Sequence, residues 1–178
     1  MINIRKNVFE TNSSSMHSLV VSKQDRGYDY NLPVDENGVL TIPFGEFGWG
    51  PEILRTPLEK LSYIITDRIN GFYDDDNKSW DEILEELKYD DDIQEIIEII
   101  KKNVPAVKEV TFEPASDFYQ CGYVDHQSQG TSRDAATEDI IFNNSIIILI
   151  DNDNSCHFED YYDGWDGAPA TKDKEELF

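Results

Sequence analysis

The sequence has no long hydrophobic run. Its longest, Ile146–Ile150, is far shorter than the roughly 20 apolar residues that a transmembrane helix requires. The start of the chain carries Arg5 and Lys6, but no apolar stretch of about 7 to 15 residues follows, as it would in a secretory signal. These absences predict a soluble, cytoplasmic protein.

Cysteine is scarce as well. Cys121 and Cys156 are the two cysteines of the chain, and they form no CxxC pair. A disulfide framework or a zinc site needs more cysteines at closer spacing. We therefore expect reduced thiols that act as small core side chains.

Basic residues are few in comparison with acidic ones. The chain has 15 Lys and Arg against 37 Asp and Glu, for a net charge of −22. Such a charge opposes direct binding to nucleic acid or to an anionic membrane. Acidic residues are concentrated in two segments. Residues 74–100 contain 12 acids and two lysines, Lys78 and Lys88, and residues 151–178 contain nine acids and two lysines, Lys172 and Lys174.

The composition favours one folded domain. The chain has 178 residues, of which 39% are hydrophobic and 12% aromatic, and this content is too high for a disordered chain. Proline and glycine gather at residues 164–169, and a charged run follows them. We expect a single domain over residues 1–170 and a flexible acidic tail over residues 171–178.

Three helices are predicted in the middle of the chain. Thr56–Glu59 has the pattern of a capping box with proline at the first helical position, and apolar residues follow at helical spacing up to Ile69, with Gly71 as a stop. Ser79–Glu82 repeats the capping pattern before a shorter helix. Asp90–Asp92 can cap a third helix, whose apolar residues recur at i, i+3, i+4 and i+7 and which Pro105 stops.

Strand patterns flank these helices. They cover Ile2–Phe9, His17–Val21, Val39–Phe44, Val107–Phe112 and Ser145–Ile150, the last apolar enough to be a central strand. A short helix over about Asp134–Ile141 is a further option. The order of strands, helices and strands predicts an α+β domain with a mixed or antiparallel sheet and about three helices packed on one face.

A polar turn near the start is the first candidate site. Asn12, Ser13, Ser14 and Ser15 offer hydroxyl and amide groups that could bind a phosphate, with His17 as an acid, base or ligand. No glycine-rich phosphate motif accompanies them. An ordinary turn has a similar composition, because these side chains bond their own backbone.

The segment Arg5–Ser18, which reads RKNVFETNSSSMHS, resembles the opening of a family of phage and prophage proteins of low-GC Gram-positive bacteria. Residues 122–128 and 150–154 are similar to later segments of the same proteins. The resemblance implies a phage or prophage origin, and hence a bacterial host cytoplasm. It assigns no catalytic residue.

Carboxylates and histidines in the second half form another candidate. Asp151 and Asp153 follow an apolar strand, where such a pair can hold a divalent cation, and His157 is close in sequence. Asp125 and His126 are the catalytic candidates besides His17. An EF-hand is excluded, because Cys156 stands where its glycine belongs. An ordinary Asx-rich turn explains the same residues.

The acidic residues form the third candidate. If residues 74–100 were a continuous helix, 12 carboxylates over about 40 Å would give one per roughly 3.4 Å, close to the charge spacing of one DNA strand. The aromatic and acidic residues 159–166 suit an arginine-rich surface. The predicted binding residues are Asp74, Asp75, Asp76, Asp81, Glu82, Glu85, Glu86, Asp90, Asp91, Asp92, Asp160, Asp163, Trp165 and Asp166. Simple solubility is the alternative reading.

Three functions are compatible with these patterns. The favoured one is a non-enzymatic, acidic phage protein that mimics nucleic acid and inhibits a basic host defence enzyme, as anti-CRISPR or anti-restriction proteins do, with no cofactor. The second is a small metal-dependent enzyme acting on a phosphate or nucleotide, with the Ser13–Ser15 turn on phosphate and a divalent ion on Asp125, Asp151 and Asp153. The third is a structural or assembly protein of a phage particle. We expect no direct contact with nucleic acid or membrane.

Overall fold

The structure is a computed structural model, and it describes residues 15–22, 24–49, 52–69, 78–116, 120–124 and 138–152. For residues 15–20 and 151–152 only the backbone is described. The predicted strand Ile2–Phe9, the stop at Gly71, the first residues of the predicted helix 134–141 and the predicted tail 171–178 lie outside these ranges. No helix of the described residues is long and apolar enough to cross a membrane.

Helix α1, Pro57–Ile69, begins at the predicted capping box. The Glu59 carboxylate accepts hydrogen bonds from the backbone N–H groups of Arg55 and Thr56, both at 2.9 Å, and the Thr56 hydroxyl accepts one from the Glu59 N–H at 3.3 Å. These contacts satisfy N–H groups that a helix start leaves without a partner. The predicted start is confirmed.

Helices α2, Trp80–Leu87, and α3, Asp91–Asn103, also follow the sequence pattern. Ser79 and Glu82 form the capping box of α2, and the Asp90 side chain accepts a hydrogen bond from the Ile93 N–H at 3.0 Å to cap α3. Each helix buries its apolar stripe. Helix α3 ends two residues before Pro105, as predicted.

A three-stranded antiparallel sheet has β7, Ile146–Asn152, at its centre. Strand β1, Ser15–Val21, pairs with it along one edge from Ser15 opposite Asn152 to Val21 opposite Ile146. Strand β4, Glu52–Leu54, pairs along the other edge. Residues Ile146–Ile150 are buried, which confirms the prediction of a central strand.

The other strands form two parallel pairs. Strand β2, Val39–Pro43, pairs with β5, Glu109–Glu113, and strand β3, Glu46–Phe47, pairs with β6, Tyr123–Val124. Strand β5 begins two residues later than predicted, because the Val107 N–H bonds the Val104 carbonyl in the turn after α3. Among the described residues the strands thus form three small sheets, and the α+β class is confirmed.

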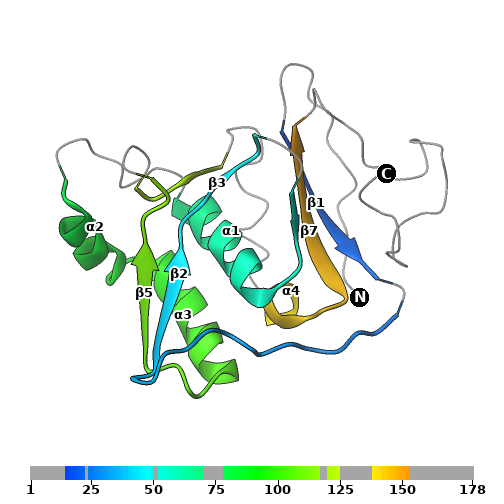
Figure 1. Ribbon diagram of the computed structural model, residues 1–178, viewed down its shortest axis with the longest axis horizontal. Helices are drawn as coiled ribbons and strands as arrows, with labels where there is room; N and C mark the ends of the chain where they lie inside the picture. Colours follow the sequence, from blue (N-terminus) through cyan, green and yellow to red (C-terminus); the bar gives the residue numbers. More distant parts are fainter. Residues whose placement is uncertain are drawn as a thin grey trace.

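Helix α1 lies at the centre of the fold (Figure 1), between the β2–β5 pair and the three-stranded sheet. Eleven of its 13 residues are buried, including Lys60, Asp67 and Arg68. It contacts β2, α3 and the short helix α4, Glu138–Phe142. The hydrophobic core surrounds it and includes Cys121, as the sequence predicted.

Candidate protein-binding site on helices α2 and α3

Exposed carboxylates gather on the two helices that the sequence identified as acid-dense. Those of the acidic α2–α3 surface, as we define it, are Asp81, Glu82, Glu85, Glu86, Asp90, Asp91, Asp92, Glu95 and Glu98. All are exposed except Asp90, which is half-buried. The first seven were predicted as binding residues. The other predicted binding residues, Asp74 to Asp76, Asp160, Asp163, Trp165 and Asp166, lie outside the described residues.

The capping box of α2 holds one of these carboxylates in place. Glu82 Oε2 accepts hydrogen bonds from the Ser79 backbone N–H and from the Ser79 hydroxyl, both at 2.8 Å. These bonds lower the pKa of Glu82, because they stabilise its charged form. Glu82 therefore stays ionised and has a defined orientation.

Two carboxylates of α2 pair with lysines. Lys78 Nζ lies 2.7 Å from Glu86 Oε2, and Lys88 forms an ion pair with Glu85 one turn away. Exposed pairs of this kind add little stability, but they offset the like-charge repulsion that the sequence pattern implies on this helix face. They also reduce the net negative charge of α2.

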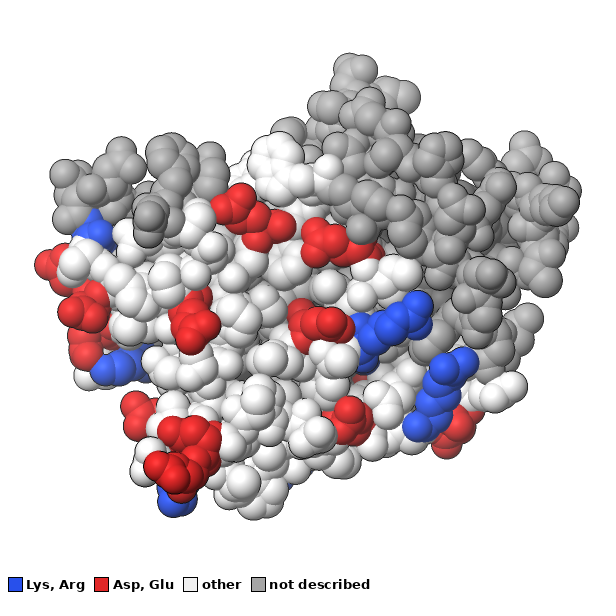
Figure 2. Space-filling model, in the orientation of Figure 1, with Lys and Arg blue, Asp and Glu red and all other residues white. Residues whose placement is uncertain are grey.

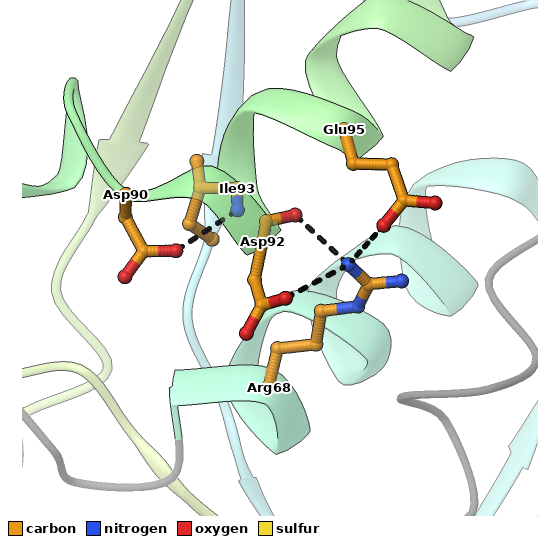
Figure 3. Close-up of polar contacts among 5 residues, drawn as sticks. All are labelled: Arg68, Asp90, Asp92, Ile93 and Glu95. Carbon is orange, nitrogen blue, oxygen red and sulfur yellow. Dashed lines mark hydrogen bonds and ion pairs between the residues drawn. The ribbon is translucent and has the colours of Figure 1, made fainter.

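A buried arginine of α1 holds the carboxylates of α3 (Figure 3). Arg68 Nη1 donates to the Asp92 carbonyl at 3.0 Å and to Glu95 Oε2 at 2.9 Å, and it lies 3.8 Å from Asp92 Oδ1. The Arg68 side chain is 2% exposed, whereas those of Asp92 and Glu95 are 53% and 60% exposed. The guanidinium thus contacts two carboxylates from the protein interior, and both carboxylates remain accessible to solvent.

Three carboxylates have no partner within the described part of the chain. The side chains of Asp81, Asp91 and Glu98 make neither a hydrogen bond nor an ion pair with another described residue, and Asp81 and Asp91 lie in the first turn of their helix. There the helix dipole favours negative charge, so these two residues do not destabilise the helices. The three are the carboxylates most available to a partner.

The acidic residues are not arranged as one straight row. Residues Lys88–Asp90 separate α2 from α3, so the continuous helix of about 40 Å considered from the sequence does not form. Figure 2 shows the acidic side chains of one face in separate groups, with basic side chains beside those at the α2 edge. A match to the regular charge spacing of DNA is therefore not a property of this surface.

The other candidate residues fall mostly outside the described ranges. This is the case for Asn12, Ser13, Ser14, Asp125, His126, Asp153 and His157. The backbone register places Ser15 opposite Asn152, Met16 opposite Asp151 and His17 opposite Ile150. Ser15, His17 and Asp151 therefore lie at the same end of the β1–β7 pair. No group of three or more potential metal ligands occurs among the described residues.

Sequence reasoning missed Arg68, Glu95 and Glu98 as parts of the surface. The sequence analysis assigned no role to Arg68, because only the packing of α1 against α3 brings it to Asp92 and Glu95. The spacing of Asp91, Glu95 and Glu98 at i, i+4 and i+7 was the available signal for a shared helix face.

Comparisons of the chain with known protein families, with curated proteins and with solved structures found no match.

Proposed function

We propose that this protein is a non-enzymatic binding protein whose acidic α2–α3 surface docks on a basic, nucleic-acid-binding protein and inhibits it. The observation that carries the proposal is the contact of buried Arg68 with two exposed carboxylates. Carboxylates that are already oriented lose less conformational entropy when a partner binds them. Hydrogen bonds hold the carboxylates of Glu95 and of the capping residues Glu82 and Asp90, and that of Asp92 lies 3.8 Å from Arg68 Nη1.

The charge of the surface defines the class of partner. Residues 78–103 contain nine carboxylates and four lysines, Lys78, Lys88, Lys101 and Lys102. The surface is therefore negatively charged, so it attracts cationic groups and repels phosphate. Proteins that bind nucleic acid present positive grooves of the opposite character. If the acidic α2–α3 surface occupied such a groove, it would exclude the nucleic acid. This form of mimicry requires negative charge in the groove but not the regular charge spacing of DNA.

The resemblance of Arg5–Ser18 to phage proteins favours a host defence enzyme as the target. A CRISPR or restriction effector has a basic nucleic-acid channel that an acidic protein can occupy. The proposal therefore places the protein in the host cytoplasm, as an inhibitor without a cofactor.

A metal-dependent enzyme, the alternative expected from the sequence, gains no support from the register of β1 and β7. Asp151 lies opposite Met16, so it belongs to the other face of the sheet from Ser15 and His17. If this function is correct, a divalent metal ion should raise the melting temperature, and the Asp151→Ala variant should not respond. An equal melting temperature with and without metal would exclude this alternative.

The binding proposal can be tested by affinity capture from a bacterial host lysate. The immobilised protein should retain a nucleic-acid-binding protein, and added duplex DNA should release it, because the two compete for one groove. Binding should also weaken steeply as the salt concentration rises. Retention that neither DNA nor salt affects would contradict the proposal.

Matched charge reversals locate the contact. The double variant Asp81→Lys/Asp91→Lys changes two carboxylates that have no described partner and cap neither helix, so it leaves both helix caps intact. We expect its affinity for the captured protein to fall roughly tenfold or more, since two attractive contacts become repulsive. The control variant Glu36→Lys/Glu46→Lys makes the same change in net charge at exposed residues outside these helices, and it should bind nearly as the wild type does. Equal losses in both variants would show that net charge alone governs binding.

A further inference from the structure

Two tyrosine rings are stacked at the surface near the C-terminal end of α3. The ring centroids of Tyr28 and Tyr30 are 5.9 Å apart with an angle of 12° between the ring planes. The two residues remain 45% and 39% exposed. Tyrosines are common anchors in protein interfaces, because a rigid ring gives a large contact area for little loss of entropy. A fixed pair of partly exposed rings is therefore a candidate contact surface.

The backbone holds these rings in place. Tyr28 forms an antiparallel bridge with Asn143, and the Asp29 N–H donates to the Phe142 carbonyl at 2.8 Å. The ring of Tyr30 packs on the buried ring of Phe142, with centroids 5.1 Å apart. The segment that carries the tyrosines is thus attached to α4 and to the turn that follows it.

Two carboxylates of α4 complete the arrangement. The Tyr28 hydroxyl donates a hydrogen bond to Asp139, and the Tyr30 hydroxyl donates one to Glu138 at 3.4 Å. The bond to Asp139 raises the pKa of Tyr28, and loss of water contact together with the charge of Glu138 raises the pKa of Tyr30. Both rings are therefore neutral at physiological pH and lie beside negative charge.

From this geometry we infer that Tyr28, Tyr30, Glu138 and Asp139 form an arginine-binding patch for a basic protein partner. A guanidinium can stack on the exposed face of a tyrosine while its N–H groups bond to a nearby carboxylate. Asp139 is the carboxylate suited to this role, since Glu138 already pairs with Lys102 at 3.1 Å.

The same chemistry disfavours other occupants. Nucleotide bases also stack on tyrosine, but the phosphate groups attached to them would be repelled by Glu138 and Asp139. A lysine ammonium is a point charge that keeps its water, and it lacks the flat surface that matches a ring. An arginine side chain satisfies both the rings and the carboxylate.

The arginine-binding patch lies in line with the acidic α2–α3 surface. Asp91, Glu95, Glu98 and Lys102 recur along α3 at i, i+4, i+7 and i+11, so they share one exposed face of the helix. Lys102 ends this row and contacts Glu138 of the patch. As far as the identity of the partner is concerned, this inference rests on the proposed function: one basic protein would contact the carboxylates of α3 and insert an arginine at the tyrosines.

Nuclear magnetic resonance of the full chain with ¹³C-labelled tyrosine rings tests the patch directly. The probes are the capped peptides Arg-Gly-Arg and Lys-Gly-Lys, and the variants Tyr28→Phe and Tyr30→Phe assign the two resonances. We expect the Arg peptide to shift the rings of Tyr28 and Tyr30 in a saturable way, with at least about threefold higher affinity than the Lys peptide. The Asp139→Asn variant should bind the Arg peptide about threefold more weakly.

Tyr123 is the internal control, because it is half-buried and stacks on the exposed ring of Trp49, outside both the arginine-binding patch and the acidic α2–α3 surface. If its ring shifts as much as those of Tyr28 and Tyr30, or if both peptides bind equally well, the inference is wrong. The Asp81→Lys/Asp91→Lys variant separates the two proposals. If its tyrosine shifts persist while capture is lost, both proposals stand. If the tyrosine shifts are absent in the wild type while capture still depends on Asp81 and Asp91, only the arginine-binding patch fails.

Discussion

The buried lysine of α1 should make the stability of this protein rise with pH. Lys60 is completely buried, and its Nζ donates to the Asn143 carbonyl at 3.0 Å. Burial lowers the pKa of Lys60 from 10.5 to about 8, although the carboxylates of Asp29 and Glu59 act in the opposite direction. In the unfolded chain the amine has its ordinary pKa.

The sign of the effect follows from proton binding. Between pH 8 and pH 10.5 the unfolded chain binds more protons at Lys60 than the folded protein, so the free energy of unfolding increases with pH. The whole shift corresponds to about 3 kcal/mol, of which about 2 kcal/mol should be gained between pH 7 and pH 9.5. Above this window the raised pKa values of Tyr28, Tyr30 and Tyr63 act in the opposite direction.

Urea unfolding of the wild type and of Lys60→Met at several pH values measures the effect. We expect the wild type to gain about 2 kcal/mol relative to the variant from pH 7 to pH 9.5. The exposed-lysine control Lys101→Met should follow the wild type at every pH. Parallel curves for the wild type and Lys60→Met would refute the reasoning, because they would mean that the Lys60 amine keeps its ordinary pKa in the folded protein.

Four further substitutions test the contacts that shape the fold and the acidic surface. Arg68→Met should lower the free energy of unfolding by about 1–3 kcal/mol, since it removes the hydrogen bonds between α1 and α3, whereas Lys88→Met at an exposed pair should leave the urea midpoint unchanged. Ser79→Ala should cost about 1 kcal/mol and reduce helix content by circular dichroism, because it removes the cap of α2. Gly27→Ala should cost about 1–2 kcal/mol for its positive φ of 68° alone. Gly122→Ala should lower the melting temperature further, because its Cβ would also overlap the Gly45 carbonyl.

Most carboxylates of the acidic α2–α3 surface could be predicted from the sequence, but their contacts could not. The seven described carboxylates that were predicted to be binding residues lie on α2, on α3 or in the turn between them, and six are exposed, because helical spacing separates them from the apolar stripes. Their individual environments were not predictable. The pairing of Asp92 and Glu95 with Arg68 joins residues 24 and 27 positions apart, and it depends on how α1 and α3 pack.

The elements whose signals are local could be predicted from the sequence. Capping boxes and apolar spacing defined α1, α2 and α3, since the hydrogen bonds that start a helix and the stripe that it buries both lie within a few residues. The unbroken apolar run of Ile146–Ile150 likewise identified the central strand.

The way in which these elements combine depends on contacts between distant parts of the chain. The parallel pairing of β2 with β5 joins strands about 70 residues apart, and no local pattern specifies that partnership. Helix α1 has other elements on nearly every side, so Lys60, Asp67 and Arg68 are buried at positions that an amphipathic pattern assigns to solvent. Burial depends on what packs against a residue from distant parts of the chain, and this dependence is the physical reason why a sequence that predicted the helices did not reveal their buried charges.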